Sequence, residues 1–295
     1  MKKAFFLILM LCASIDPAFA KVNVVATLPW IGSIAREVGK DRVTVSVLVK
    51  PNQDAHYIEA KPSMILAVSK ADVLMYNGLD LEVGYLPLIV TQSRNSKIQP
   101  GQRGNLDCSR FVDAIETPHG EIDRSMGDVH PFGNPHYHFS PRRVLSVAEG
   151  MAGVLSDIEP SHAEAYKANL AAFREKVHAR QKAWGALPIR GKRFVAYHKI
   201  FEYLADDFGF RIEAYVEPKP GISPSAGHLE KLIELLRRTR PDGILTTSFY
   251  GRREVEFLAQ KTGVKGIVVP HDIGAAEGTD DWLSFMDRVL SALSK

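Results

Sequence analysis

Short apolar stretches and amphipathic stretches alternate along the first part of the chain. Residues 22–30 (VNVVATLPW) and 42–50 (RVTVSVLVK) are rich in β-branched residues, which favour strands. Between them, Ile31, Ile34 and Val38 recur at the spacing of one helix face. This order of strand, helix and strand is typical of a parallel sheet with covering helices, because parallel strands need a crossover connection.

The same alternation continues after residue 61 and returns in the last third of the chain. Residues 62–78 predict a helix that leads into a strand at 73–76 and a turn at Asn77-Gly78. Beyond residue 190 the pattern predicts further strands and helices in alternation. The strands are expected at 193–198, 211–216, 242–248 and 264–272, and the helices at 199–209, 225–240, 253–263 and 279–294.

Residues 161–184 lack glycine and proline and are rich in Ala, Lys, Glu and Arg, which predicts one long helix. Ser161, with Glu164 three residues later, predicts a capping box at its start. At about 1.5 Å per residue this helix would reach roughly 36 Å, the width of a domain. The expected fold is therefore α/β, with two lobes, each a mostly parallel sheet flanked by helices, joined by one long rigid helix. We expect an N-terminal lobe at 21–140, a helical linker that includes the long helix at 141–189, and a C-terminal lobe at 190–295.

The first 20 residues have the pattern of a secretory signal peptide. Two lysines precede a short apolar run, and Ala18-Phe19-Ala20 ends the segment as a small-x-small cleavage site. Cleavage after Ala20 and a periplasmic location are therefore expected. A lipid anchor on Cys12 is disfavoured, because Leu11 is bulky where a small residue is normally required.

The charge of the chain argues against some classes of partner, and its cysteine content argues against a disulfide bond. Removal of Lys2, Lys3 and Asp16 with the signal peptide lowers the formal net charge from +3 to +2. Charges of both signs are scattered along the chain, so neither a nucleic acid nor a membrane surface is an expected partner. Cys108 is the one cysteine of the mature chain, which rules out an intramolecular disulfide.

Several candidate metal ligands fall where predicted strands end, which is where ligands bind in open parallel sheets. Neutral imidazole and a single carboxylate oxygen suit borderline ions such as Zn²⁺. The spacing of these residues matches no local metal motif, so it leaves open whether both, one or neither of the two histidines in the stretch GNPHYHFSP binds. The candidates are His56 after the strand 42–50, His136 and His138 in GNPHYHFSP, His198 at the end of the strand 193–198, and His271 and Asp272 at the end of the strand 264–272.

Four separated stretches, in order, resemble the metal-binding periplasmic solute-binding proteins (cluster A-I) that feed ABC importers for zinc or manganese. The stretch from Asp54 to Glu82 resembles the family's segment in which a histidine is followed by a Pro-Ser helix start and an Asn-Gly-Leu run. NPHYHFSP resembles its Asp-Pro-His-x-Trp-x-Asp-Pro. YHKIFEYLADDFG and PHDIGA resemble its strand-end histidine and its stretch with a ligand carboxylate. The resemblance covers nearly the whole mature chain.

The resemblance implies that His56, His136, His198 and Asp272 are the metal ligands. His138 falls where the family usually has tryptophan, and alternation along an extended loop points its side chain away from that of His136. Glu59 is expected to orient His56 through a hydrogen bond. Asn134 and Ser140 depart from the acidic residues that are usual around this motif, which removes negative charge and possible hydrogen-bond partners from the site.

The segment 113–133 corresponds to the place where the zinc branch often carries a long loop rich in histidine and acidic residues. Here it has only His119 and His130 among five carboxylates. Two interpretations stay open. It is either an auxiliary metal site that hands an ion inward, or a solvated surface loop.

Three imidazoles and one carboxylate favour Zn²⁺ over Mn²⁺, which prefers more oxygen ligands. We therefore expect a non-enzymatic, monomeric zinc-binding component of an ABC importer that delivers its ion to a permease with an ATPase, with a periplasmic metallochaperone as a further candidate partner. A manganese-binding homologue and a metal-dependent adhesin are the alternatives. A zinc hydrolase is less consistent, because four protein ligands leave no position for water. Affinity is expected to fall toward pH 6 as imidazoles of ordinary pKa take up protons.

Overall fold

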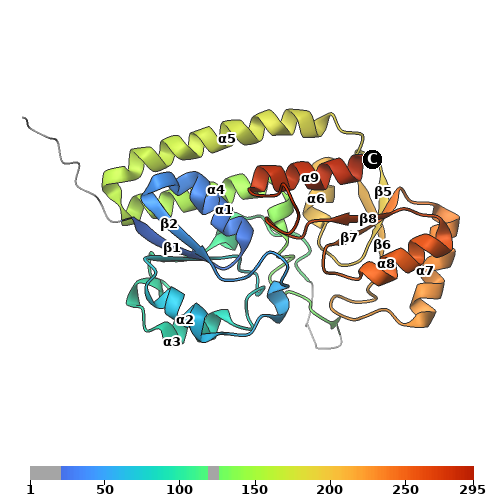
Figure 1. Ribbon diagram of the computed structural model, residues 1–295, viewed down its shortest axis with the longest axis horizontal. Helices are drawn as coiled ribbons and strands as arrows, with labels where there is room; N and C mark the ends of the chain where they lie inside the picture. Colours follow the sequence, from blue (N-terminus) through green and yellow to red (C-terminus); the bar gives the residue numbers. More distant parts are fainter. Residues whose placement is uncertain (1–20, 119–125) are drawn as a thin grey trace, which may run out of the picture.

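The computed structural model describes residues 21–118 and 126–295 of the 295-residue chain. The predicted signal peptide and His119 lie outside these described residues. Two parallel four-stranded sheets stand side by side, and a long helix crosses both (Figure 1). None of the helices in the described ranges is both long enough and apolar enough to cross a membrane.

The first sheet has the strand order β2-β1-β3-β4, and every pair in it is parallel. The β-branched run VNVVA forms β1 at its centre, where all but Asn23 are buried. Because the order reverses at β1, the carboxyl ends of β1 and β3 form a switch point, where such sheets bind ligands. The strands are β1 (Val22–Ala26), β2 (Val43–Val47), β3 (Val73–Tyr76) and β4 (Asn105–Asp107), with helices α1 (Pro29–Gly39), α2 (Pro62–Ser69) and α3 (Leu86–Ser93).

The second sheet repeats this order as β6-β5-β7-β8, again with every pair parallel. Its switch point is at the carboxyl ends of β5 and β7. The strands are β5 (Arg193–Ala196), β6 (Arg211–Tyr215), β7 (Gly243–Thr247) and β8 (Gly266–Val269). The helices are α6 (Glu202–Phe208), α7 (Ala226–Thr239), α8 (Arg252–Thr262) and α9 (Trp282–Ser294).

Helices α4 (Pro141–Ile158) and α5 (Ala163–Gly185) connect the two sheets, and α5 runs along one side of both lobes (Figure 1). The last helix, α9, returns from the second lobe and packs against α5 and α1. Beside a smaller apolar cluster confined to the second lobe, one apolar core therefore extends through both lobes. At its centre Phe139 contacts Phe201 and Phe285, with ring centroids 5.5 and 5.4 Å apart. A shared core of this kind resists large hinge movements between lobes.

The expected α/β class, with two parallel sheets and a long connecting helix, is confirmed. We keep 21–140, 141–189 and 190–295 as the proposed division of the chain. The capping box at Ser161 is wrong: residues Pro160–His162 form a 3-10 turn, and α5 begins at Ala163 without a side-chain cap. Helix α6 also begins later than expected, because the chain turns after β5, where the amide of Ile200 donates to the carbonyl of His198.

Candidate metal site

Three histidines from distant parts of the chain meet between the two sheets. His56 lies in the 3-10 turn η2 (Ala55–Tyr57) after β2, His136 directly precedes the 3-10 turn η6 (Tyr137–Phe139), and His198 lies two residues beyond β5. One ring nitrogen of each lies within 4.8 Å of the other two. The ring centroids are 5.4, 5.5 and 5.8 Å apart, so the rings form a nearly regular triangle. Nitrogens gathered in this way are a donor set for a divalent ion.

Two carboxylates fix the orientation of two of these rings. His56 Nδ1 lies 2.6 Å from Asp54 Oδ1, and His198 Nδ1 lies 2.7 Å from Glu217 Oε2. When Nδ1–H donates to a carboxylate, the tautomer is fixed and Nε2 keeps its lone pair for a metal. The acceptor oxygens therefore leave a lone pair on both Nε2 atoms, and that of His56 faces Nε2 of His130 at 3.0 Å in this structure.

Asp54 has the role that the sequence suggested for Glu59, whose side chain is exposed. The expectation for Glu59 is therefore wrong, since a neighbour two residues before His56 reaches the ring from within the same turn. Tyr250, from the second lobe, donates to Asp54 Oδ2 at 2.5 Å, and so ties this carboxylate across the two lobes. Glu217 follows β6, so the strand-end rule that selected the histidines could have identified it as well.

His136 is the most enclosed of the three rings, with 3% of its surface exposed. Burial, together with the neighbouring histidines, holds the pKa of His136 well below its usual range. Its Nε2 is buried and has no hydrogen-bond partner among the described residues. A buried polar atom without a partner is unfavourable, so a neutral nitrogen in this position is well placed to accept a metal ion.

Asp272 lies three residues beyond β8 and is not one of the three residues whose donor atoms gather within 4.8 Å. It lines a narrow cleft together with His56 and His136. Its Oδ1 accepts from the amide of Ile273 at 2.7 Å. Burial raises the pKa of Asp272 to about 8, so the carboxyl group is mostly protonated at neutral pH. Its role as a ligand remains a prediction.

His138 and His271 lie outside the group of three. The ring of His138 stacks between Trp30 and Phe285, and its Nε2 donates to the carbonyl of His271 at 3.2 Å. Burial lowers the pKa of His138 to about 4. His138 therefore has a packing role. The loop is not extended here as expected, because residues Tyr137–Phe139 form a 3-10 turn that directs the ring of His138 into the core.

His130 approaches the site from the segment 113–133. Its Nε2 lies 3.0 Å from Nε2 of His56, and its ring bonds to the backbone of Leu79. Burial and the nearby His56 lower the pKa of His130 to about 3, so the ring is neutral. Two imidazole nitrogens that face each other this closely share a proton or can share a metal ion. The sequence left open whether His130 belongs to an auxiliary metal site or to a solvated loop, and it did not indicate this contact.

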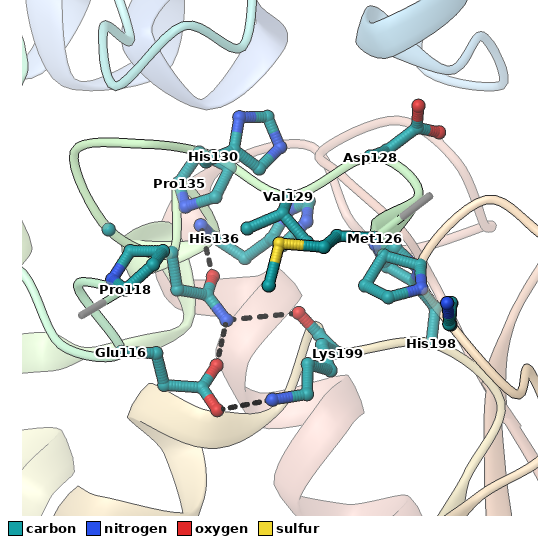
Figure 2. Close-up of a pocket in the computed structure, with 14 residues that line it drawn as sticks. Glu116, Pro118, Met126, Asp128, Val129, His130, Pro135, His136, His198 and Lys199 are labelled. Atoms are coloured by element: carbon teal, nitrogen blue, oxygen red, sulfur yellow. Dashed lines mark hydrogen bonds and ion pairs between the residues drawn. The ribbon is translucent and has the colours of Figure 1, made fainter. Parts of the chain in front are cut away.

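A cavity of about 590 Å³ opens beside the histidines (Figure 2). His130, His136 and His198 line it, and Glu116 and Lys199 form an ion pair at 2.7 Å on its wall.

The segment that carries His130 contacts both lobes. The amide of Asp128 donates to the carbonyl of Pro220 at 2.9 Å, and the Tyr57 hydroxyl donates to the Asp128 carboxylate.

Comparisons with known proteins show the family to which the chain belongs. Residues 24–295 match the family described as ZnuA, zinc-uptake complex component A, periplasmic. The chain is 26% identical to the zinc-binding lipoprotein AdcA of Streptococcus pneumoniae serotype 4 (strain ATCC BAA-334 / TIGR4), over 98% of this chain but only 58% of AdcA. It is 24% identical to the manganese ABC transporter substrate-binding lipoprotein ScaA of Streptococcus gordonii over the full length of both. A crystal structure of ZnuA superposes with a TM-score of 0.77 at 25% identity, covering 93% of this chain and 98% of that one.

Proposed function

The chain belongs to the ZnuA family, the periplasmic metal-binding components of ABC importers, and within that family we propose that it captures Zn²⁺. Members of this family are solute-binding proteins rather than enzymes. The observation that carries the proposal is the group formed by His56, His136 and His198, with one nitrogen of each within 4.8 Å of the others. Three neutral imidazoles are a better donor set for Zn²⁺ than for Mn²⁺, which prefers oxygen. Relatives named for zinc and for manganese both match the chain, so the choice of metal rests on these ligands.

We propose that Asp272 completes the site as the fourth ligand. Its carboxyl group lines the same cleft as His56 and His136, and it is buried. A tetrahedral site of three nitrogens and one carboxylate oxygen has a net charge of +1, lower than that of the bare ion. Because burial raises the pKa of Asp272 to about 8, the carboxyl group must lose its proton when the ion binds.

Titration of the mature protein with Zn²⁺ at pH 7 is therefore expected to release about one proton per ion. Apparent affinity should rise by up to about tenfold per pH unit below pH 8 and level off above it, because deprotonation of Asp272 is linked to binding. His136 adds little to this dependence near pH 6, since burial already keeps its ring neutral, in contrast to the expectation from ordinary imidazoles. Calorimetry in buffers of different ionisation enthalpy measures the proton count.

The matched control for this titration is Asp272→Asn, which keeps the shape of the side chain and removes the ionisable proton. It should bind Zn²⁺ more weakly and without proton release at pH 7. Mn²⁺, titrated in the same buffers, should bind more weakly than Zn²⁺. Zinc binding by the wild type with no proton release would contradict the linked deprotonation of Asp272, and equal zinc affinity of the wild type and Asp272→Asn would contradict its role as a ligand. Tighter binding of Mn²⁺ would contradict the choice of metal.

We further propose that His130 is an auxiliary ligand that hands the ion to the three histidines. Its Nε2 lies 3.0 Å from Nε2 of His56 on the cavity side of the site. An ion held between His130 and His56 needs to move only a short distance to reach His136 and His198. His119 lies outside the described residues, so this proposal concerns His130 alone.

The remaining features of the proposed function concern processing and partners. We propose that the signal peptide is cleaved after Ala20 and that the protein acts as a monomer in the periplasm. Its partners would be the membrane permease and the ATPase of the importer, and a periplasmic metallochaperone is a further candidate. The core that extends through both lobes supports a capture mechanism with little hinge movement. Release to the permease would then require displacement of the loops that carry the ligands.

A further inference from the structure

The side chain of Asn134 links the backbones beside two of the proposed ligands. Its Oδ1 accepts a hydrogen bond from the amide of His136 at 2.9 Å, and its Nδ2 donates to the carbonyl of Lys199 at 3.0 Å. Lys199 directly follows His198. A single buried amide, 6% exposed, thus connects the loop of His136 to the turn of His198, which belongs to the second lobe.

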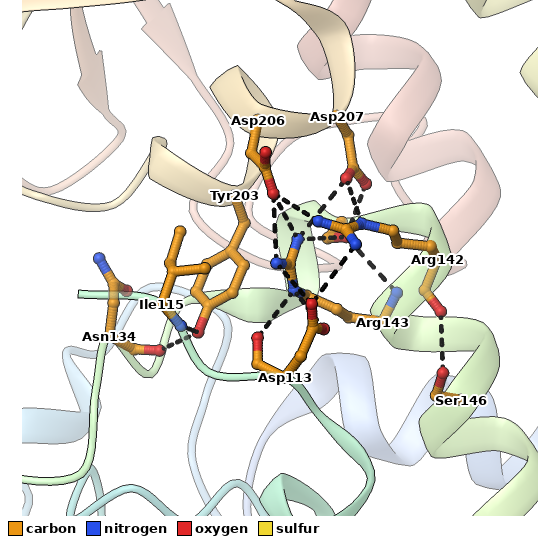
Figure 3. Close-up of polar contacts among 10 residues, drawn as sticks. Asp113, Ile115, Asn134, Arg142, Arg143, Ser146, Tyr203, Asp206 and Asp207 are labelled. Carbon is orange, nitrogen blue, oxygen red and sulfur yellow. Dashed lines mark hydrogen bonds and ion pairs between the residues drawn. The ribbon is translucent and has the colours of Figure 1, made fainter. Parts of the chain in front are cut away.

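The main chain of Asn134 is held equally firmly. Its amide donates to the carbonyl of Ile115 at 2.9 Å, and its carbonyl accepts from the hydroxyl of Tyr203 at 2.6 Å (Figure 3). The ring of Tyr203 lies under the guanidinium of Arg143, 4.4 Å from its centroid, and Arg143 pairs with Asp206. Because α4 carries Arg143 and α6 carries the other two residues, Asn134 is fixed where the two lobes join.

The surroundings of Asn134 require an amide and disfavour a carboxylate. Besides the Lys199 carbonyl, Nδ2 faces Glu116 Oε2 at 3.0 Å and Glu202 Oε2 at 3.4 Å. A carboxylate at position 134 could still accept from the amide of His136, but its second oxygen would face three other oxygens, those of the Lys199 carbonyl and of the Glu116 and Glu202 carboxyl groups. Burial, with Glu116 nearby, already raises the pKa of Glu202 to about 7. The acidic residue that is usual in the resembled motif would therefore be unfavourable here.

We propose that Asn134 is a positioning residue that sets the separation between His136 and His198, and that this chain requires an amide at that position. The inference rests on the proposed function, since it assumes that both histidines bind the ion. In this proposal Asn134 holds two of the three histidines at the separation that a tetrahedral ion needs, because its side chain restrains the backbone next to both His136 and His198.

The test is Asn134→Asp, which changes an N–H donor into an oxygen with almost no change in shape. Zinc affinity, measured by competition with a chromophoric chelator, should fall by about tenfold or more, or about 1.4 kcal/mol. Co²⁺ bound in place of Zn²⁺ should lose visible absorption intensity, because the site departs from tetrahedral geometry. The same affinity and the same Co²⁺ spectrum as the wild type would overturn the inference.

Asn95→Asp is the matched control, because in both asparagines Oδ1 accepts from the amide two residues on and Nδ2 donates to a backbone carbonyl. Asn95 Nδ2 donates to the carbonyls of Val68 and Ala71 at 2.9 and 2.7 Å, and its Oδ1 accepts from the amide of Lys97. This asparagine belongs to the first lobe, and these bonds have no connection to the ligands. Asn95→Asp should lower thermal stability and leave zinc affinity and the Co²⁺ spectrum unchanged. Equal loss of affinity in both variants would indicate a general effect on stability and would overturn the inference.

A second change, Glu116→Gln, tests the mechanism in the Asn134→Asp background. The new amide can donate to the new carboxylate, so part of the lost affinity and of the Co²⁺ intensity should return. No recovery in a folded double variant would contradict the proposed hydrogen-bond requirement. If Asn134→Asp does not fold, Asn134→Ala, which adds no charge, takes its place. Its zinc affinity should also fall by about tenfold or more, and an unchanged affinity would overturn the inference. Absence of zinc binding by the wild type would instead refute the proposed function itself.

Discussion

The His198→Ala variant is expected to retain almost no zinc after dialysis, whereas the wild type retains about one ion per chain. His198 supplies one of the three gathered nitrogens, and its removal also leaves the buried carboxylate of Glu217 without its ring partner. Apparent binding free energies of about 10–16 kcal/mol, shared among four ligands, correspond to a loss on the order of 100-fold to 1000-fold per ligand. Elemental analysis of metal-saturated protein measures the outcome directly.

His130→Ala is the control for this experiment, because it removes an imidazole from the wall of the same cavity. As an auxiliary ligand, His130 should affect the rate of uptake, so its variant should still retain about one zinc per chain. If His198→Ala retained its zinc and His130→Ala lost it, the ion would lie nearer to the mouth of the cavity than proposed. This result would contradict the proposed ligand set. Circular dichroism of both variants would confirm that each is folded.

Replacement of Glu217 by glutamine is expected to weaken zinc binding by about 10-fold to 100-fold, the range for partners that orient a metal-ligating histidine. The Glu217 carboxylate accepts from Nδ1 of His198 at 2.7 Å and from the amide of Gly221 at 3.1 Å. Glutamine can occupy the same space, but it is neutral, so the imidazole becomes a weaker donor to the ion. The measurement is a competitive titration of Glu217→Gln beside the wild type.

Glu213→Gln provides the matched control, since Glu213 lies on β6 in the same lobe and pairs with Arg193 at the surface. This change should leave zinc affinity unaltered. If Glu217→Gln bound zinc as tightly as the wild type, zinc binding by His198 would not depend on the Glu217 carboxylate, which would contradict this prediction.

The alternating pattern predicted the architecture well where elements are long or deeply buried. The runs VNVVA and GILTT form the central strands β1 and β7, because β-branched residues suit buried parallel strands. Strand β4 was not predicted. It is three residues long (Asn105–Asp107) at the sheet edge, and only Leu106 in it is buried, so it carries almost no periodic signal. Helix α3 (Leu86–Ser93) was missed as well, since its two turns are too short for a clear period.

In the candidate site, the sheet topology determines where the histidines lie, whereas the local turns determine which carboxylates contact their rings. His56 and His198 follow strands of different sheets, and the meeting of the two sheet edges is seen only in the structure. The position of each histidine at the binding edge of its own sheet could be expected from the sequence. The partners of their rings could not, because the direction of each Nδ1 depends on the turn that carries it. Asp54 is selected over Glu59 by the 3-10 turn at Ala55–Tyr57, and no sequence period reports that turn.

The central claim is that His56, His136 and His198, with Asp272, surround one zinc ion. Zinc K-edge X-ray absorption spectroscopy of the wild type, loaded with one equivalent of Zn²⁺, tests it most directly. The predicted result is a four-coordinate shell at about 2.0–2.1 Å, with the outer-shell scattering of three imidazoles and one oxygen ligand. A shell made mainly of oxygen, with scattering from fewer than three imidazoles, would contradict the account.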